Sequence, residues 1–177
     1  GLKADAVMTM YRGAVEPMIL YAVEVWGTAL QLKWASATLI RLQRAVLLRI
    51  CKSYRTVSSD ALQILAGVLP LDLKAKMVMI LAEIKDRQGG SLSSAAKKEV
   101  MEGLFTEWDQ RWSGSTKGRQ TAKFFPSVPS RMMLEGYVPN FVATQFMTGH
   151  GKFGTYLESM NIRDSPECRC GGVQTPM

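Results

Sequence analysis

The sequence KWASATLIRLQRAVLLRICKSYR occupies residues 33–55 and has the pattern of an amphipathic helix. Its apolar residues recur at three- and four-residue spacing, which places their side chains on one face of a helix. This apolar stripe consists of Leu39, Leu42, Val46 and Ile50, widened by Leu47 and Cys51. The pattern predicts a helix over residues 36–51 whose stripe faces the core of the protein.

The opposite face of this helix is basic, because residues 25–59 contain no Asp or Glu. At about 100° per residue the cations form one broad band, which raises the local potential for an acidic polymer. Solvated helix faces usually mix both signs, so the band favours contact with nucleic acid over an ordinary solvated surface. The candidate contact residues are Lys33, Arg41, Arg44, Arg49, Lys52, Tyr54 and Arg55.

The composition is that of a globular protein. The chain has 177 residues, 47% of them hydrophobic and 21% charged, which suffices for one substantial core or two small ones. The net charge of +7 and the pI near 9.5 favour nucleic acid as the partner, with an anionic membrane surface as the weaker alternative. No apolar run approaches the roughly 18 residues that a membrane span needs.

Two further features concern location and completeness. The sequence shows no signal peptide and has only three cysteines, so we expect an intracellular, reducing environment. The first residue is Gly1, and a helical pattern begins almost at once. We therefore expect a fragment of a longer protein.

Helical patterns recur along the chain. Residues 4–14 suit a first helix, and Pro17 indicates either a kink or the start of a second helix that carries residues 18–26. A Ser-Ser-Asp cluster is a good N-cap for a short helix over residues 60–66, which stops at Gly67. Further helices are predicted after Pro70 and over residues 94–112, 141–147 and 152–160. With no sustained period-two pattern, the predicted fold class is all-α.

The run Gly89-Gly90-Ser91 is the best candidate for a boundary between two packing units. It divides the chain into a helical bundle over residues 1–88 and a smaller helical unit with an irregular basic loop over residues 89–164. A short end segment, residues 165–177, follows.

The irregular loop lies in a second acid-free segment, residues 111–131, where cations alternate with aromatic rings. This mixture suits phosphate contacts combined with base stacking. The candidates are Arg111, Trp112, Lys117, Arg119 and Lys123. An alternative stays open, in which the rings anchor the core and the cations belong to a solvated loop.

Candidate metal ligands are few. Cys168 and Cys170, in a Gly-rich turn, look like the first half of a zinc knuckle, which needs two further ligands. Only His150 and Cys51 remain as donors, and neither has a spacing that supports such a role, so we expect no zinc binding by this chain alone. For His150 we expect a structural or phosphate-proximal role, because no carboxylate or nucleophile accompanies it in a catalytic pattern.

Five blocks of the sequence together resemble one family, the reverse transcriptases of non-LTR (LINE-type) retrotransposons, in the region downstream of the polymerase palm. They occur in the family's order and span nearly the whole chain. The blocks are EPMILYAVEVWGTAL (16–30), LQRAVLLRICKSYRTVSSDALQILAGVLPLDL (42–73), WDQRWSGSTKGRQT (108–121), TQFMTGHGKFGTYL (144–157) and SPECRCGG (165–172).

The resemblance implies a thumb of packed helices over residues 1–88, a helical linker over 89–164 and the truncated start of a Cys-Cys-His-Cys zinc knuckle over 165–177. In that family the thumb grips the duplex of template RNA and primer, and the linker and knuckle help engage RNA and target DNA during target-primed reverse transcription. The implied partners are the RNA template, the RNA/DNA hybrid, the target DNA and the palm domain of the same polyprotein. The implied location is the nucleus, with no membrane partner.

The sequence departs from the family pattern at two places. The usual glycine of the L-Y-G-x-E-x-W block is Ala22, a small departure, and the histidine and last cysteine of the knuckle are missing. Zinc binding would therefore depend on ligands supplied from elsewhere. The family's polymerase also needs palm aspartates that hold two magnesium ions, and no such paired-aspartate motif occurs here. We expect no polymerase activity from this chain alone.

Two other hypotheses compete with a binding part of a reverse transcriptase. A freestanding helical adaptor would present its basic face to acidic protein or membrane surfaces. An enzyme that uses His150 or Cys168 in hydrolysis would need partner groups that the sequence does not show. Competition by a duplex RNA–DNA hybrid discriminates between the binding hypotheses.

Overall fold

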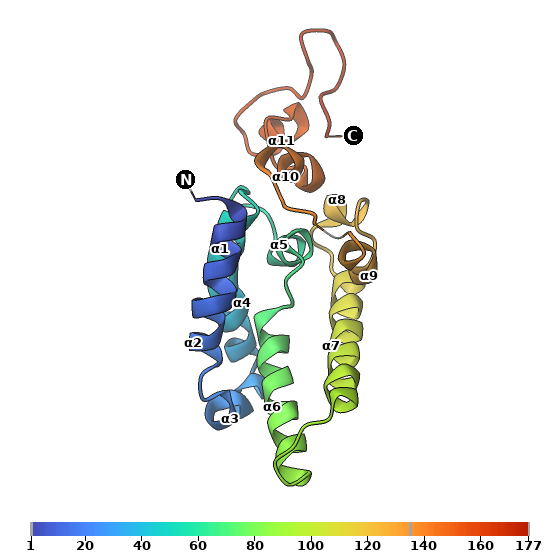
Figure 1. Cartoon of the computed structure of the whole chain (residues 1–177). Coiled ribbons are helices and arrows are strands. Elements are labelled where there is room, and N and C mark those ends of the chain that lie inside the picture. The colour runs from blue at the N-terminus through green and yellow to red at the C-terminus, as the bar shows by residue number, and fades with distance from the viewer. Residues whose placement is uncertain (1, 135, 177) are drawn as a thin grey trace.

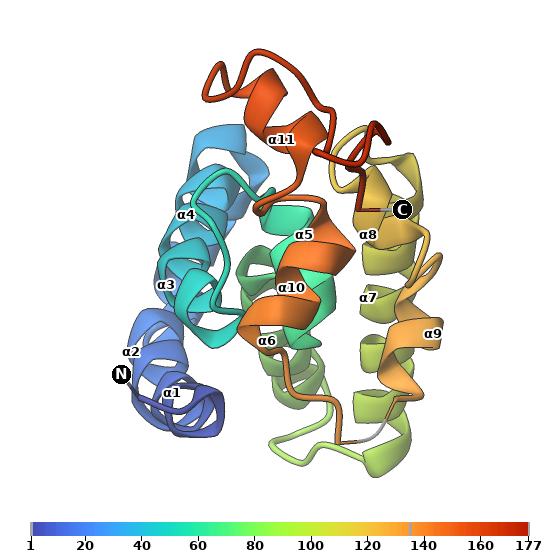
Figure 2. The same cartoon turned by 90° about the horizontal axis from the view of Figure 1, so that it is seen from above.

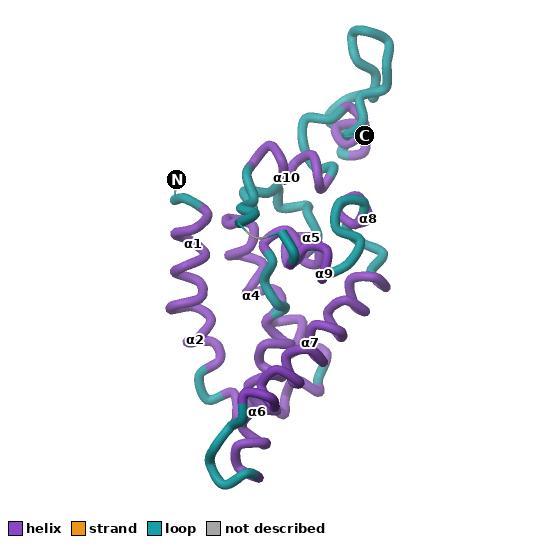
Figure 3. The backbone as a smooth tube through the Cα atoms, turned by 45° about the vertical axis from the view of Figure 1, so that its right-hand side comes forward, coloured by secondary structure: helices purple, strands orange, loops and turns teal. Residues whose placement is uncertain are grey.

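The computed structural model describes residues 2–134 and 136–176, and the regular elements in these ranges are all helical (Figures 1 and 3). The closest approach to strand pairing there is one isolated antiparallel bridge between Glu167 and Val173. The all-α prediction is therefore confirmed. The helices are α1 (Ala4–Met10), α2 (Glu16–Leu20), α3 (Val23–Trp26), α4 (Lys33–Ile50), α5 (Ser59–Ala66), α6 (Leu71–Arg87), α7 (Ser94–Gly114), α8 (Arg119–Ala122), α9 (Val128–Met132), α10 (Phe141–Thr148) and α11 (Gly154–Ser159).

The long helices α4, α6 and α7 lie side by side, and α6 and α7 form an antiparallel hairpin (Figure 1). Helices α1 to α3 cover α4 and α6 on one side of the molecule (Figures 1 and 2). Helices α10 and α11, with the C-terminal segment, lie at the end of the bundle opposite the α6–α7 turn (Figure 1).

Helix α5 is the centre of the fold. Its N-cap Ser58 accepts a hydrogen bond from the Ala61 N–H, and Gly67 ends it in the left-handed conformation at φ +62°. Six consecutive residues of α5, from Ala61 to Ala66, are buried, because α4, α8 and α9 all pack around this helix. The predicted short helix and both of its boundary signals are confirmed.

One hydrophobic core joins the two halves of the chain. It combines Leu47 and Ile50 of α4 and most of α5 with Trp108 and Trp112 of α7 and with Phe125. A smaller hydrophobic cluster joins α3 to α4 and α6 through Val23, Leu39, Leu71 and Ala75. The division into units near Gly89 and Gly90 stays a prediction, and the structure adds that residues on both sides of that turn share a core.

The first helical segment differs from the prediction. Residues 4–20 form one helical run that contains a π-helical turn, Tyr11–Val15, directly before α2. Pro17 lies in the first turn of α2, which agrees with the predicted start of a second helix at this proline. The predicted continuous helix over residues 18–26 is wrong. It breaks after Leu20, because Ala22 adopts the left-handed conformation at φ +51°, and α3 restarts at Val23.

The buried stripe of α4 is shifted from the predicted one. Leu42 was expected in the core but is 49% exposed, whereas Gln43 is fully buried. Gln43 is stable there because its amide Nε2 donates to the Tyr11 hydroxyl at 3.1 Å and to the Leu69 carbonyl at 2.8 Å. Its Oε1 accepts from Gln63 Nε2 at 2.9 Å and from the Leu71 N–H at 3.2 Å. A buried amide with every group paired replaces the expected apolar contact.

Candidate nucleic-acid interface

The outer face of α4 carries exposed cations. Lys33, Arg41 and Arg49 on the helix and Lys52 just beyond it are all exposed, and none of them forms an ion pair within residues 2–134 and 136–176. Exposed Ala37 and Ala45 lie on the same side of the helix. Short side chains between cations allow a sugar–phosphate backbone to approach closely, and uncompensated cations attract it.

Exposed apolar side chains accompany this basic face. Trp34 is 65% exposed near the start of α4, and Leu42 is exposed next to Arg41. Because the helix buries its other side through Leu39, Gln43 and Leu47, the outer face stays accessible along its whole length. The predicted basic surface is therefore present, with Trp34 as a flat ring that the sequence analysis did not single out.

Arg44 differs from its neighbours because its guanidinium serves the fold. Nη2 donates to the Arg55 carbonyl at 2.6 Å, and Nη1 donates to Ser59 Oγ at 3.3 Å. These bonds fasten α4 to the loop that follows it and to the start of α5. Burial lowers the pKa of Arg44 from its usual value.

The loop after α4 connects to the far end of the chain. The Tyr54 ring lies 6.2 Å from Phe141 and 6.4 Å from Tyr156, measured between centroids. Thr56 Oγ1 lies 2.8 Å from both His150 Nδ1 and the Tyr156 hydroxyl. Tyr54 thus helps to seat α10 and α11, and the Arg55 side chain beside it is exposed.

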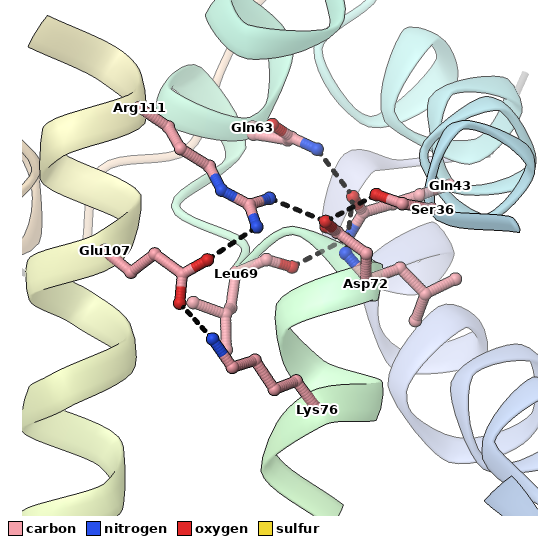
Figure 4. A network of polar contacts seen from close by, with 9 residues as sticks. Ser36, Gln43, Gln63, Leu69, Asp72, Lys76, Glu107 and Arg111 are labelled. Atoms are coloured by element: carbon pink, nitrogen blue, oxygen red, sulfur yellow. Dashed lines mark hydrogen bonds and ion pairs between the residues drawn. The ribbon is translucent and has the colours of Figure 1, made fainter. Parts of the chain in front are cut away.

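Arg111 lies in a polar network between α6 and α7 (Figure 4). Its Nη1 lies 2.6 Å from Asp72 Oδ2, and its Nη2 lies 2.7 Å from Glu107 Oε1. Lys76 pairs with the other Glu107 oxygen at 2.6 Å. Burial alone would raise the pKa of Glu107, but the hydrogen bonds from Lys76 and Arg111 outweigh it and lower that pKa. The Arg111 charge is compensated within the protein.

Trp112 is only 2% exposed, and its Nε1 donates to the Phe125 carbonyl at 2.8 Å. Arg119 covers its ring, with the guanidinium carbon 4.9 Å from the ring centroid, and donates to the Trp112 carbonyl at 2.8 Å. Of the two interpretations of this segment, the burial of Trp112 favours the ring as a core anchor. Lys117 and Lys123 are exposed.

His150 is half-buried, and burial lowers its pKa below the usual value of 6.5. Besides its bond to Thr56, its ring lies 4.9 Å from that of Tyr156. These contacts position the segment between α10 and α11 against the loop after α4, which agrees with the structural role expected for this residue.

Cys168 and Cys170 lie in an exposed turn near the C-terminus. Hydrogen bonds from Cys170, chiefly from its backbone, lower the pKa of the Cys168 thiol, which favours the thiolate form that binds metals. Among the residues that the structure describes, no group of three or more His, Cys, Asp or Glu side chains is placed to hold a metal ion. The two thiols therefore do not by themselves fit a tetrahedral zinc shell. Cys51 is buried in the core, and burial raises its pKa to about 12.

Within the same described ranges, the helices are all too short or too polar to cross a membrane.

Nearly the whole chain is similar to curated proteins of retrotransposable elements. It is 34% identical to the Retrovirus-related Pol polyprotein from type-1 retrotransposable element R1 of Bradysia coprophila, over 97% of this chain and 18% of that protein. It is 30% identical to the R1 2 Pol polyprotein of Nasonia vitripennis, over 98% of this chain and 45% of that protein. It is also 30% identical to the Putative 115 kDa protein in type-1 retrotransposable element R1DM of Drosophila melanogaster, over 97% of this chain and 18% of that protein.

The chain thus spans less than half the length of each of these relatives. No protein-family model and no solved structure matches it.

Proposed function

The chain is a homologue of the Pol polyproteins of R1 non-LTR retrotransposons, and we propose that it is a nucleic-acid-binding part of such a polyprotein. In this proposal residues 1–88 act as the thumb, residues 89–164 as a helical linker, and residues 165–177 begin a zinc knuckle. The chain grips the duplex of template RNA and primer and the target DNA during target-primed reverse transcription in the nucleus.

The observation that carries the proposal is the exposed, acid-free face of α4. Arg41, Arg49 and Lys52 are accessible and lack carboxylate partners in the described ranges. A rigid helix that presents such cations binds phosphates without reading the base sequence. Lys33, Arg55, Lys117 and Lys123 add exposed cations, whereas Arg44, Arg111, Trp112 and Arg119 also hold parts of the fold together.

Catalysis belongs, in this proposal, to other parts of the polyprotein. The sequence carries no paired-aspartate motif for the two magnesium ions of nucleotidyl transfer, so the chain contributes binding and positioning. Zinc binding at Cys168 and Cys170 would require further ligands from outside this chain.

The experiment is a binding competition with the full chain and a fluorescently labelled RNA–DNA hybrid. We expect the hybrid to bind, and unlabelled hybrids of unrelated sequence to displace it equally well, because phosphate contacts carry no sequence information. Vesicles with anionic lipid and an acidic protein serve as the other competitors. Absence of hybrid binding, or stronger displacement by vesicles or acidic protein than by hybrid, would contradict the proposal.

A further inference from the structure

A pocket of about 640 Å³ opens between the middle of α4, the start of α5 and the segment that leads into α8. Its volume lies within the range of about 300–1,000 Å³ that is typical of ligand sites. Its polar lining includes Arg44, Ser58, Ser59, Lys117, Thr121 and His150. Most of these side chains are cations or hydrogen-bonding groups, and they come from four separate parts of the chain.

The start of α5 supplies hydrogen-bond donors to this pocket. Ser58 and Ser59, the N-cap and first residue of the helix, both line it. The first N–H groups of a helix have no partner within the helix and carry partial positive charge. Such a helix end suits an anion.

The cations at the pocket have donors to spare. The guanidinium of Arg44 has five N–H groups, of which one contacts Ser59 Oγ and one the Arg55 carbonyl. Lys117 is exposed and forms no ion pair with the described residues. Gly118, at φ +68°, lets the backbone next to Lys117 approach α5 closely, because a Cβ at this position would lie 3.1 Å from the Ala61 side chain and 3.2 Å from Ser58 Oγ.

A buried hydroxyl gives independent support. Thr121 is 0% exposed and lines the pocket, and its Oγ1 has no hydrogen-bond partner among the residues of the described ranges. Buried polar groups are nearly always paired, so the Thr121 hydroxyl is a donor still without a partner at the wall of the cationic pocket.

The charges at the pocket define the ligand class. Arg44 and Lys117 contribute two positive charges, and Asp60, which also lines the pocket, contributes one negative charge. The Asp60 carboxylate accepts from Ser115 Oγ at 2.7 Å, which holds it on the side of the loop before α8. Burial lowers the pKa of His150, so its imidazole is neutral at pH 7. The net charge of one unit matches a phosphodiester, which carries a single negative charge.

We propose that this pocket, lined by Arg44, Lys117 and the first turn of α5, binds one phosphodiester group of a nucleic-acid backbone. The proposal rests on the proposed function and adds a defined binding site for one phosphate beside the basic face of α4. Phosphate contacts of this kind fix the register and orientation of the strand on the protein.

The test uses the full chain, a short RNA–DNA hybrid of arbitrary sequence, and the variants Lys117→Gln and Lys97→Gln. Lys97 lies exposed on α7 outside the pocket and gives a matched loss of one charge. We expect Lys117→Gln to reduce the slope of log affinity against log salt by about one, and Lys97→Gln to leave it unchanged. Amide NMR of the wild-type chain should show that hybrid shifts the Ser59 and Asp60 N–H signals.

The possible outcomes separate this inference from the proposed function. If hybrid binds but Lys117→Gln behaves like Lys97→Gln and the Ser59 and Asp60 signals do not move, the proposed phosphate site is refuted and the proposed function stands. If neither the wild-type chain nor the variants bind hybrid, both the proposed function and the proposed phosphate site are refuted.

Discussion

Arg111 Nη1 lies 2.6 Å from Asp72 Oδ2 and links α7 to α6, with Asp72 only 5% exposed. Ser36 Oγ donates to the same carboxylate oxygen at 2.8 Å, so α4 joins this connection (Figure 4). An arginine from the segment expected to contact nucleic acid thus ties together three long helices.

The ion pair predicts a large effect of removing its buried member. Asp72→Asn should lower the free energy of unfolding by about 2–4 kcal/mol, because it leaves the Arg111 charge with less compensation. A double-mutant cycle with Arg111→Gln, followed by chemical denaturation, should give a coupling energy of at least about 1 kcal/mol. Additive effects of the two substitutions would show that the pair contributes nothing beyond its separate residues.

Glu107 predicts a dependence of stability on pH. Its pKa in the folded protein is lowered from 4.5, because the bonds from Lys76 and Arg111 outweigh the effect of burial. A carboxyl group with a lowered folded-state pKa stabilises the fold at neutral pH, and this contribution is lost as the pH falls below about 4.5. Melting temperatures measured across this pH range should fall more steeply for the wild-type chain than for Glu107→Gln. Parallel curves would contradict this role of Glu107.

The shifted stripe of α4 predicts opposite results for two leucines of the same helix. Leu47 is fully buried, with 0% of its surface accessible to solvent, whereas Leu42 is 49% exposed. Leu47→Ala should therefore lower the free energy of unfolding by about 2–5 kcal/mol through the cavity that it leaves. Leu42→Ala, as the matched control, should cost less than about 1 kcal/mol. Equal losses of unfolding free energy for the two variants in urea denaturation would contradict the shifted stripe and support the one predicted from the sequence.

Ala22 predicts a stabilising substitution. Its φ of +51° is unfavourable for a residue with a Cβ by roughly 1–2 kcal/mol, and glycine adopts it freely. After the larger chain entropy of glycine in the unfolded state is subtracted, Ala22→Gly should raise the free energy of unfolding by up to about 1 kcal/mol. The same change at Ala37, in the second turn of α4, should lower it by about 0.5–1 kcal/mol. A loss of stability for Ala22→Gly as large as that for Ala37→Gly would refute this explanation.

The sequence predicts the helices well where boundary signals and apolar spacing agree. Ser58 and Gly67 define α5, and Ser93 at the start of α7 follows the same rule. The sequence also predicts the basic surface of α4, because an absence of acids is visible without a structure. The family that the sequence resembles usually has glycine at position 22, and this signal for a break was missed in the prediction of a continuous helix over residues 18–26. Glycine suits the position because it adopts the left-handed conformation of Ala22 freely.

Other features depend on tertiary contacts that spacing does not reveal. Gln43 is buried only because Tyr11, Gln63 and Leu69 surround it, and none of these is near it in sequence. The pairing of Arg111 with Asp72 likewise joins residues 39 positions apart. Polar partners therefore explain both the shifted stripe of α4 and the change in the expected role of Arg111.

In the proposed function, the outer face of α4 binds the backbone of a nucleic-acid duplex. Its most direct test is the affinity for an RNA–DNA hybrid, measured against salt concentration, of the variant Arg41→Gln, Arg49→Gln and Lys52→Gln. Arg44 is left intact, because its bonds to Arg55 and Ser59 support the fold. The control carries Lys85→Gln, Lys97→Gln and Lys98→Gln, three exposed positions on the α6–α7 hairpin, and loses the same charge.

We expect the α4 variant to keep the melting temperature of the wild-type chain and to bind unrelated hybrids equally weakly. Its slope of log affinity against log salt should fall by up to about three, while the control changes little. A folded α4 variant with unchanged affinity and slope would contradict the proposed function.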